Sequence, residues 1–197
     1  MSSNRPEKGT FGLRRFFWDL VHRRERFRQL LGVLFCILVS TLGTPRQAMV
    51  FWAGVAIAAA GILIRLWASG HVKKDKVLAT DGPYGFVRHP LYVGNILIGL
   101  GFCLSSGLWW SYPLFLVFLL VYYPPAIHQE DAKLHHLFGE TWESWSSRTR
   151  ALIPRLTPYS SGQDGRWSFG QSLRQNGEPI IAIFLLVWLY VLFLELP

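Results

Sequence analysis

Long apolar stretches alternate with short polar stretches along most of the 197-residue chain. The apolar stretches lie at residues 30–43, 49–69, 92–110, 112–127 and 179–194. A helix needs about 20 apolar residues to cross a bilayer, and the shorter stretches can be extended by their neighbours. The pattern therefore predicts an all-α fold, a polytopic transmembrane helical bundle of about five spans.

The polar stretches divide the chain into expected segments. We expect a basic N-terminal segment at residues 1–29, a membrane core at 30–158, a linker at 159–178 and an extra C-terminal transmembrane helix at 179–197. Ser and Gly in the linker indicate a loop. Pro124 and Pro125 lie near the end of the fourth apolar stretch and remove two amide donors from any helix there. Such prolines are tolerated in a membrane where the freed backbone is buried or faces a cavity.

The composition is typical of a membrane protein. Hydrophobic residues make up 51% of the chain, aromatic residues 15% and charged residues only 16%, whereas soluble domains have about 25% charged residues. The net charge of +8 lies in blocks between the apolar stretches, which fits the positive-inside rule better than a nucleic-acid surface. We therefore expect membrane lipids as partners and no nucleic acid.

The distribution of Lys and Arg predicts an orientation. Basic residues crowd the segment before the first apolar stretch, the loop 70–91 and the region 128–178, while the other connections hold only Arg46. The positive-inside rule then places the N-terminus and both basic regions in the cytoplasm and the C-terminus outside. This orientation applies to the cell membrane of a prokaryote or the endoplasmic reticulum of a eukaryote. Arg65, near the cytoplasmic end of the second span, is expected to snorkel to the interface. Cys36 and Cys103 lie in apolar runs and are expected to be buried thiols.

The first polar cassette on the cytoplasmic side is GPYGFVRHPLYVG, residues 82–94. The residue before a proline prefers an extended backbone, and proline favours the first turn of a helix, so a helix is expected to start at Pro90. Arg88 and His89 then lie at a helix N-terminus, where free amides, the helix dipole and a forked guanidinium favour an anion. An interfacial arginine that meets lipid phosphate is the alternative.

The second cassette begins at His128, directly after the fourth apolar stretch. Glu130 would need a cationic partner if it points back into the bundle, whereas Asp131 is expected to be a solvated residue at a helix start. Apolar residues recur downstream at helical spacing and predict an amphipathic helix against the membrane face: Leu134, Leu137, Phe138, Trp142 and Trp145. Adjacent histidines such as His135 and His136 point about 100° apart on a helix, so no metal site is expected.

The two cassettes together resemble a known family. GPYGFVRHPLYVG, an apolar hairpin, the pattern ED-x-x-L-x-x-x-FG-x-x-W-x-x-W and then IPR resemble the isoprenylcysteine carboxyl methyltransferases. These belong to a wider group of integral membrane methyltransferases that includes the phospholipid methyltransferases. The likeness covers roughly residues 65–155. It implies that the core at 30–158 uses S-adenosylmethionine (SAM), held in a cytoplasmic pocket built from the loop before span 3 and the region after span 4.

The resemblance also implies the residues of that pocket. The implied cofactor-binding residues are Lys76, Val77, Leu78, Ala79, Tyr84, His89, Pro90, Leu91, Tyr92 and Glu130. We assign catalytic roles to Arg88 and Glu130. Arg88 with His89 suits the carboxylate of SAM, and Glu130 suits its ammonium group. The rings of Tyr84 and Tyr92 offer faces to the adenine or the sulfonium.

The identity of the methyl acceptor stays open. Family members that methylate a prenylcysteine carboxylate carry an Arg four residues before the Glu, where this chain has Ala126. A lipophilic or small acceptor could be such a carboxylate, a phospholipid amine or a thiol. Two other functions remain: a sterol-type membrane reductase that uses NADPH, and a non-enzymatic scaffold or transporter. Few charges within the spans and no inverted repeat count against transport.

Overall fold

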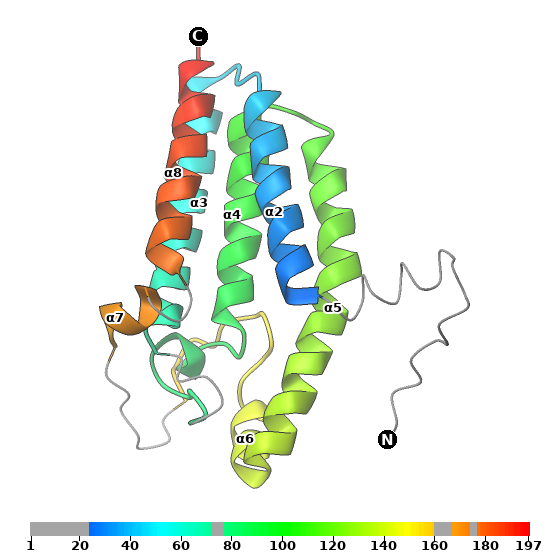
Figure 1. Cartoon of the computed structure of the whole chain (residues 1–197), viewed down its shortest axis with the longest axis vertical. Coiled ribbons are helices and arrows are strands. Elements are labelled where there is room, and N and C mark those ends of the chain that lie inside the picture. The colour runs from blue at the N-terminus through cyan, green and yellow to red at the C-terminus, as the bar shows by residue number, and fades with distance from the viewer. Residues whose placement is uncertain (1–23, 72–76, 160–166, 174–176) are drawn as a thin grey trace, which may run out of the picture. The chain divides into compact units, whose positions relative to one another are not determined.

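The computed structural model describes residues 24–71, 77–159, 167–173 and 177–197. Helices make up the ordered elements of these ranges (Figure 1). The apolar helices are α2 (Arg24–Thr41), α3 (Ala48–Ser69), α4 (Pro90–Ser106), α5 (Ser111–Phe138) and α8 (Glu178–Leu194). Three short elements connect them: the 3-10 helix η1 (Gly82–Gly85), α6 (Glu140–Ser146) and α7 (Phe169–Gln171).

The five predicted apolar stretches all form helices in the structure. Two of them, α3 and α5, are long and apolar enough to cross a membrane, while α4, α8 and the part of α2 from residue 29 on are shorter apolar helices. The fold class of an all-helical membrane protein is therefore confirmed, and the number of spans stays a prediction. The chain forms two compact units, Met1–Phe35 and Cys36–Pro197. The second unit holds everything that bears on the site.

Helices α3 and α4 form the tight centre of the second unit. A Cβ atom on Gly61 of α3 would lie 2.6 Å from the carbonyl oxygen of Gly94 on α4. A Cβ atom on Gly101 of α4 would lie 2.6 Å from the carbonyl oxygen of Gly54 on α3. Small residues let two membrane helices approach closely enough for extensive van der Waals contact. The glycines therefore allow close contact between the two helices along their length.

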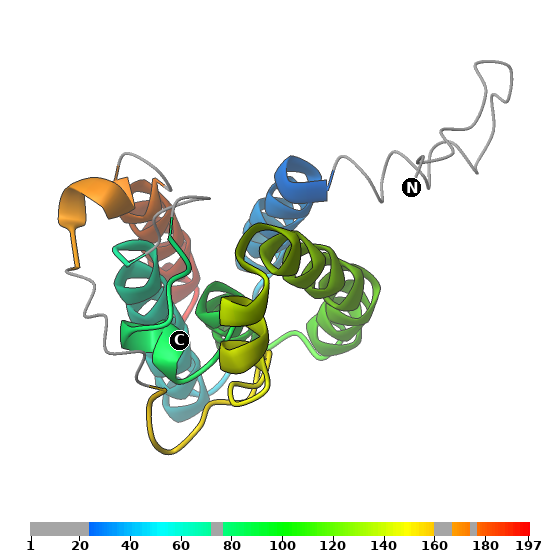
Figure 2. The ribbon, with the colours of Figure 1, turned by 90° about the horizontal axis from the view of Figure 1, so that it is seen from below.

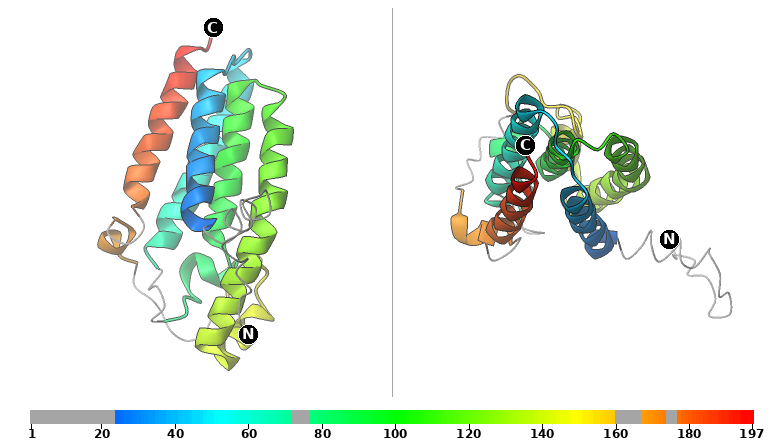
Figure 3. Two further views of the ribbon diagram at one scale, coloured as in Figure 1. Left: turned by 45° about the vertical axis from the view of Figure 1, so that its right-hand side comes forward. Right: turned by 90° about the horizontal axis from the view of Figure 1, so that it is seen from above.

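Helices α5 and α8 pack on opposite sides of this central pair (Figure 3). A Cβ atom on Gly99 of α4 would overlap the ring of Phe115 on α5 at 2.2 Å. On the other side, Phe193 of α8 lies against Phe51 and Trp52 of α3, with ring centroids 6.2 and 5.8 Å apart. The last helix is thus an integral part of the second unit.

The structure corrects the predicted boundary after the fourth apolar stretch. Helix α5 continues unbroken through Pro124 and Pro125 and ends at Phe138, before Gly139 with φ of 48°. The separate amphipathic helix expected over residues 134–145 is therefore wrong. Each proline removes only its own amide bond, and helices of a membrane bundle tolerate that loss when surrounding groups compensate. The last turns of α5 consequently carry Glu130 and Asp131, and α6 folds back beside them (Figure 2).

Other expectations can be placed within the described residues. Cys36 and Cys103 are buried free thiols, as predicted. The predicted linker contains the short helix α7. Most of the predicted basic segment at 1–29 lies outside the described residues. Arg65 does not snorkel: its guanidinium is bound inside the bundle by Glu178 and Asn95.

Candidate active site

The segment after α6 runs alongside the loop before α4 and is joined to it by backbone hydrogen bonds (Figure 2). These bonds run from Arg88 N to Arg150 O (2.9 Å), His89 N to Ala151 O (3.1 Å), Arg155 N to Phe86 O (2.9 Å) and Tyr159 N to Gly85 O (2.8 Å). They bring the two polar cassettes together on one end of the second unit. They also occupy the amides of Arg88 and His89, which the sequence led us to expect free for an anion.

The loop before α4 has a defined shape set by a glycine and two prolines. Gly82 has φ of 53°, a left-handed conformation that favours glycine. Pro83 follows at the start of η1, and the amide of Tyr84 donates to the carbonyl of Asp81 at 3.0 Å. Helix α4 begins at Pro90, as predicted, with His89 as its N-cap residue. The loop thereby presents the side chains after Gly82 to α5 and α6.

Asp131 is the ionic centre of the site. Its Oδ2 lies 3.0 Å from Nη1 of Arg88, and its Oδ1 lies 3.0 Å from Nε2 of His89. Only 16% of the Asp131 side chain is exposed, so the expectation of a solvated residue is wrong. Because α5 does not end at its prolines, position 131 lies inside a helix and faces the loop. Asp131 holds Arg88 and His89 side by side.

Glu130 points toward α4 from the neighbouring position. The hydroxyl of Tyr92 donates to Oε2 of Glu130 at 2.8 Å, and Nδ1 of His89 lies 3.8 Å from the same oxygen. The ring of Tyr92 stacks on His89, with centroids 5.3 Å apart. The Glu130 side chain is still 47% exposed. Its carboxylate therefore keeps capacity for a cationic ligand group.

A second group of aromatic residues closes the other side of the loop. Trp145 of α6 is buried and donates from Nε1 to the carbonyl of Tyr84 at 3.1 Å. Both side chains share one cluster with Ala68 of α3 and Leu78. Burial raises the pKa of Tyr84, and the nearby charges of Glu130 and Glu178 act in the same direction. The Tyr84 phenol is thus neutral at physiological pH.

Two buried donors near this cluster have no acceptor within the described part of the chain. They are Nε of Arg88 and Nε1 of Trp142, and the Arg88 guanidinium carbon lies 5.9 Å from the centre of the Trp142 ring. Buried donors are nearly always paired in native proteins. Each of these donors lacks an acceptor oxygen of the kind that an anionic ligand carries, while Glu130 and the tyrosine rings suit a cationic and aromatic part. These residues fit a cofactor that carries a carboxylate, an ammonium group, a sulfonium and an adenine.

The predicted cofactor residues divide into three groups. Leu78, Ala79, Tyr84 and Leu91 meet in the cluster around Trp145, and Pro90, His89, Tyr92 and Glu130 lie at the start of α4 and opposite it on α5. The Val77 side chain is exposed, and Lys76 lies outside the described residues. The roles of all these residues stay predictions. The structure adds Asp131, Trp142 and Trp145, which stand in the second motif but were interpreted from the sequence as a solvated residue and as packing residues of a helix.

Ala126 lies one turn of α5 before Glu130, in a buried cluster with Tyr92 and Tyr123. The partly buried neighbours of this cluster are Ile96, Phe118, Leu119, Tyr122, Ile127 and Leu152. The lining next to Tyr92 is therefore aromatic and apolar. Among the described side chains there is no group of three or more His, Cys, Asp and Glu residues placed to hold a metal ion.

Comparisons with known proteins identify a family and several relatives. The model of the phospholipid methyltransferase family matches residues 28–141, more than half of the chain. A cobalt-zinc-cadmium resistance protein of Cupriavidus metallidurans is 41% identical over 110 residues, which cover 54% of this chain and 48% of that protein. The protein-S-isoprenylcysteine O-methyltransferase of Schizosaccharomyces pombe is 37% identical over 83 residues, 42% of this chain and 35% of the enzyme.

A more distant likeness involves sterol reductases. A delta(14)-sterol reductase of Candida albicans is 30% identical over 91 residues, 44% of this chain and 19% of the reductase. The chain spans about half the length of the resistance protein, 48%, and smaller shares of the two enzymes. No solved structure matches the chain.

Proposed function

The chain belongs to the phospholipid methyltransferase family, and from this premise we propose that it is a membrane enzyme that transfers a methyl group from SAM to a lipophilic or small acceptor. One observation carries the proposal. The two polar cassettes meet through Asp131, which binds Arg88 and His89, and through the hydrogen bond from Tyr92 to Glu130. These are the stretches on which the resemblance to membrane methyltransferases rests.

We assign the charged ends of SAM to opposite sides of this site. Nε of Arg88 and Nε1 of Trp142, both buried donors, would bind the carboxylate. The exposed half of the Glu130 carboxylate would bind the ammonium group. Asp131 orients Arg88 and leaves its Nε available, since the ion pair uses Nη1. The catalytic role of both Arg88 and Glu130 is to position the cofactor for the transfer.

In this scheme the protein positions the reactants and excludes water. When bound, SAM provides a methyl carbon whose bond to sulfur breaks, with the electron pair kept by sulfur, as an acceptor lone pair attacks. Such a displacement gains most from alignment of the reacting atoms and from exclusion of water. The buried rings of Tyr84, Tyr92 and Trp145 exclude water around the loop. The neutral phenol of Tyr84 and the ring of Tyr92 offer faces to the sulfonium charge.

The acceptor would approach along the apolar cluster of Tyr92, Tyr123 and Ala126. A prenylcysteine carboxylate would find no cation at position 126, because Ala126 occupies it. A phospholipid amine needs no cation there, since it attacks as the neutral free base, whereas a thiol attacks as its thiolate. The relatives named above include both a methyltransferase and a metal resistance protein, so a binding experiment has to precede any assignment of the acceptor.

Isothermal titration of the purified protein in detergent tests the cofactor. We expect SAM to bind the wild-type protein and Glu130→Gln to weaken binding by roughly 10- to 100-fold, the range for a lost charge-assisted hydrogen bond. Glu143→Gln is the matched control, because Glu143 also pairs with a histidine, His135, but is 61% exposed on α6. A wild-type protein that binds NADPH and not SAM would instead be a sterol-type reductase.

The acceptor can be found with methyl-labelled SAM. The purified protein is incubated with labelled SAM and a membrane extract, and the labelled product is identified by mass spectrometry. We expect label in a lipid amine, the acceptor whose nucleophilic form needs no cation at position 126. Label in a methyl ester would contradict the argument from Ala126, and an extract without any labelled product would argue against the enzymatic function.

A further inference from the structure

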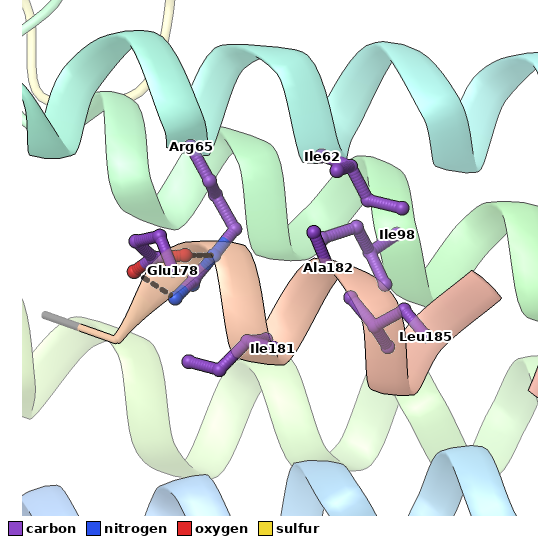
Figure 4. A pocket seen from close by; sticks show the side chains of 7 residues that line it. All are labelled: Ile62, Arg65, Ile98, Glu178, Ile181, Ala182 and Leu185. Atoms are coloured by element: carbon purple, nitrogen blue, oxygen red, sulfur yellow. Dashed lines mark hydrogen bonds and ion pairs between the residues drawn. The ribbon is translucent and has the colours of Figure 1, made fainter. Parts of the chain in front are cut away.

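A buried ion pair fastens the last helix to the centre of the bundle (Figure 4). Nε of Arg65 on α3 donates to Oε2 of Glu178 at 2.9 Å, and Nη2 donates to Oε1 at 2.6 Å. Nη1 of Arg65 donates to Oδ1 of Asn95 on α4. Only 13% of the Arg65 side chain and 5% of the Glu178 side chain are exposed. Three helices therefore meet at one guanidinium group.

All three nitrogen atoms of this guanidinium are occupied by protein oxygens. Apolar side chains surround the pair and line the small crevice beside it: Ile62, Ile98, Ile181, Ala182 and Leu185. A charged pair in such surroundings is costly to desolvate, so its presence marks a function or a requirement for specific geometry. Each nitrogen already has a protein partner and only 13% of the side chain is exposed, so Arg65 is poorly suited to bind a substrate. A role in holding other groups in place fits it better.

The ion pair lies close to the residues that begin α4. The Cγ atom of Arg65 would lie 2.5 Å from a Cβ atom on Gly94, so the arginine stem crosses α4 at this glycine. Asn95 is the next residue, less than one turn after Tyr92. The bond from Arg65 to Asn95 consequently sets the rotation of α4 where it carries His89 and Tyr92.

A second set of contacts ties the segment before α8 to the end of α3. The hydroxyls of Ser172 and Ser69 lie 2.6 Å apart and are buried. The indole of Trp167 donates to the carbonyl of Leu66 at 3.3 Å, and the ring fills the space where a Cβ atom on Gly70 would lie. The end of α3 in turn contacts the loop before α4. Ala68 packs in the Tyr84 cluster, and Nδ1 of His71 lies 3.1 Å from Oδ2 of Asp81.

We propose that α8 positions the cofactor site through a clamp made of Arg65, Asn95 and Glu178. The clamp fixes α3 and α4 relative to each other where one helix supports the loop with Tyr84 and the other carries Tyr92. Glu178, Ser172 and Trp167 all lie after residue 141, beyond the part that matches the family. Helix α8 thus acts on this site indirectly, with Arg65 and Glu178 as positioning residues. The inference rests on the proposed function insofar as the positioned ligand is SAM.

An apolar replacement of the whole pair separates positioning from simple stabilisation. Replacing a buried ion pair by apolar residues of similar volume is often neutral for stability. We expect the double variant Arg65→Met with Glu178→Leu to keep a melting temperature near that of the wild type. Its Kd for SAM should nevertheless rise roughly tenfold, the scale of coupling through a packed network. Glu178→Gln alone should raise the Kd and also lower the melting temperature.

A ligand-free measurement makes the test independent of SAM. Hydrogen exchange of the wild type and the double variant, both without ligand, should show faster exchange in residues 77–89 of the variant. Ile183→Ala, an exposed position on the same helix, is the control and should change neither exchange nor Kd. A double variant with wild-type exchange in this loop would overturn the clamp. A wild-type protein that binds no SAM while the loop exchanges faster in the variant would instead overturn the proposed function.

Discussion

Two Arg–carboxylate pairs lie among the described residues of the second unit, and they differ in how completely their atoms are used. In the pair of Arg65 and Glu178, each nitrogen of the guanidinium meets an oxygen and the carboxylate is buried. In the pair of Arg88 and Asp131, one nitrogen forms the bond and Nε has no acceptor within the described residues. Glu130 beside it is 47% exposed.

We infer that the first pair is a structural contact and that the second belongs to the proposed binding site. A buried polar group without a partner costs free energy that folding alone gives no reason to tolerate. Such a cost is expected where a ligand completes the missing bonds. In this proposal the pair of Arg65 and Glu178 holds helices together, and the pair of Arg88 and Asp131 belongs to a site that a ligand completes. The following variants test this contrast, beginning with the one for which we expect the strongest change.

Arg88→Met should have the largest effect, because it removes the unsatisfied donor and the ion pair to Asp131 at once. We expect the Kd for SAM to rise about 100-fold, as for the loss of hydrogen bonds to a charged group. Arg88→Lys keeps the charge but offers no donor in the position of Nε, so its Kd should lie between those of Arg88→Met and the wild type. Titration calorimetry measures all three. Equal Kd values for the lysine variant and the wild type would contradict the role of Nε.

Asp131→Asn should lower stability more than any change at Glu130. The variant leaves Arg88 and His89 facing a neutral amide, which we expect to lower the free energy of unfolding by about 2 kcal/mol. Glu130→Gln should leave stability nearly unchanged, because Glu130 is half exposed. Chemical unfolding in detergent compares the two variants. A larger loss of stability for Glu130→Gln would reverse our assignment of support to Asp131 and ligand binding to Glu130.

Gly82→Ala tests the loop that lies between the two pairs. A left-handed backbone costs a residue with a side chain about 1 kcal/mol, and the new Cβ atom would lie 2.6 Å from the ring of His71. We expect a lower melting temperature and weaker SAM binding. Gly32→Ala in α2 is the control, since a Cβ atom there meets no atom within 4 Å. A Gly82 variant as stable as the Gly32 variant would contradict the strained turn.

Glu143→Gln should have the smallest effect. Its partner His135 lies 2.7 Å away, but both side chains are at least half exposed. Exposed ion pairs contribute about 0.5 kcal/mol or less. Thermal unfolding should therefore place this variant close to the wild type. A clear loss of stability would show that an exposed ion pair of this protein contributes as much to stability as a buried one, contrary to our inference.

The sequence predicted the positions of the apolar helices well, but it did not predict where α5 ends. The apolar stretches predicted α3 and α8 within one residue of their observed bounds. The start of α4 at Pro90 followed from proline chemistry. The end of α5 was missed because an isolated sequence does not show whether the prolines at 124 and 125 break a helix or are accommodated in it.

The candidate site shows the same division at the level of single residues. His89, Tyr92 and Glu130 were named from the sequence, and the structure brings them into one group. Asp131 was expected to be solvated, and its role depends on which side of α5 faces the loop. Nε of Arg88 and Nε1 of Trp142, the buried donors without an acceptor, belong to two segments that lie more than 50 residues apart along the chain. The sequence alone does not show that these segments meet.

What the sequence determined by itself were properties that follow from local chemistry: an all-helical membrane protein, a helix start at Pro90 and the family to which two polar cassettes point. The tertiary structure decided which charges meet. Arg65 was expected at the interface and lies in a bond with Glu178, 113 residues away. The physical reason is that desolvation and ion pairing depend on distances between segments, and residue types along one chain do not specify those distances.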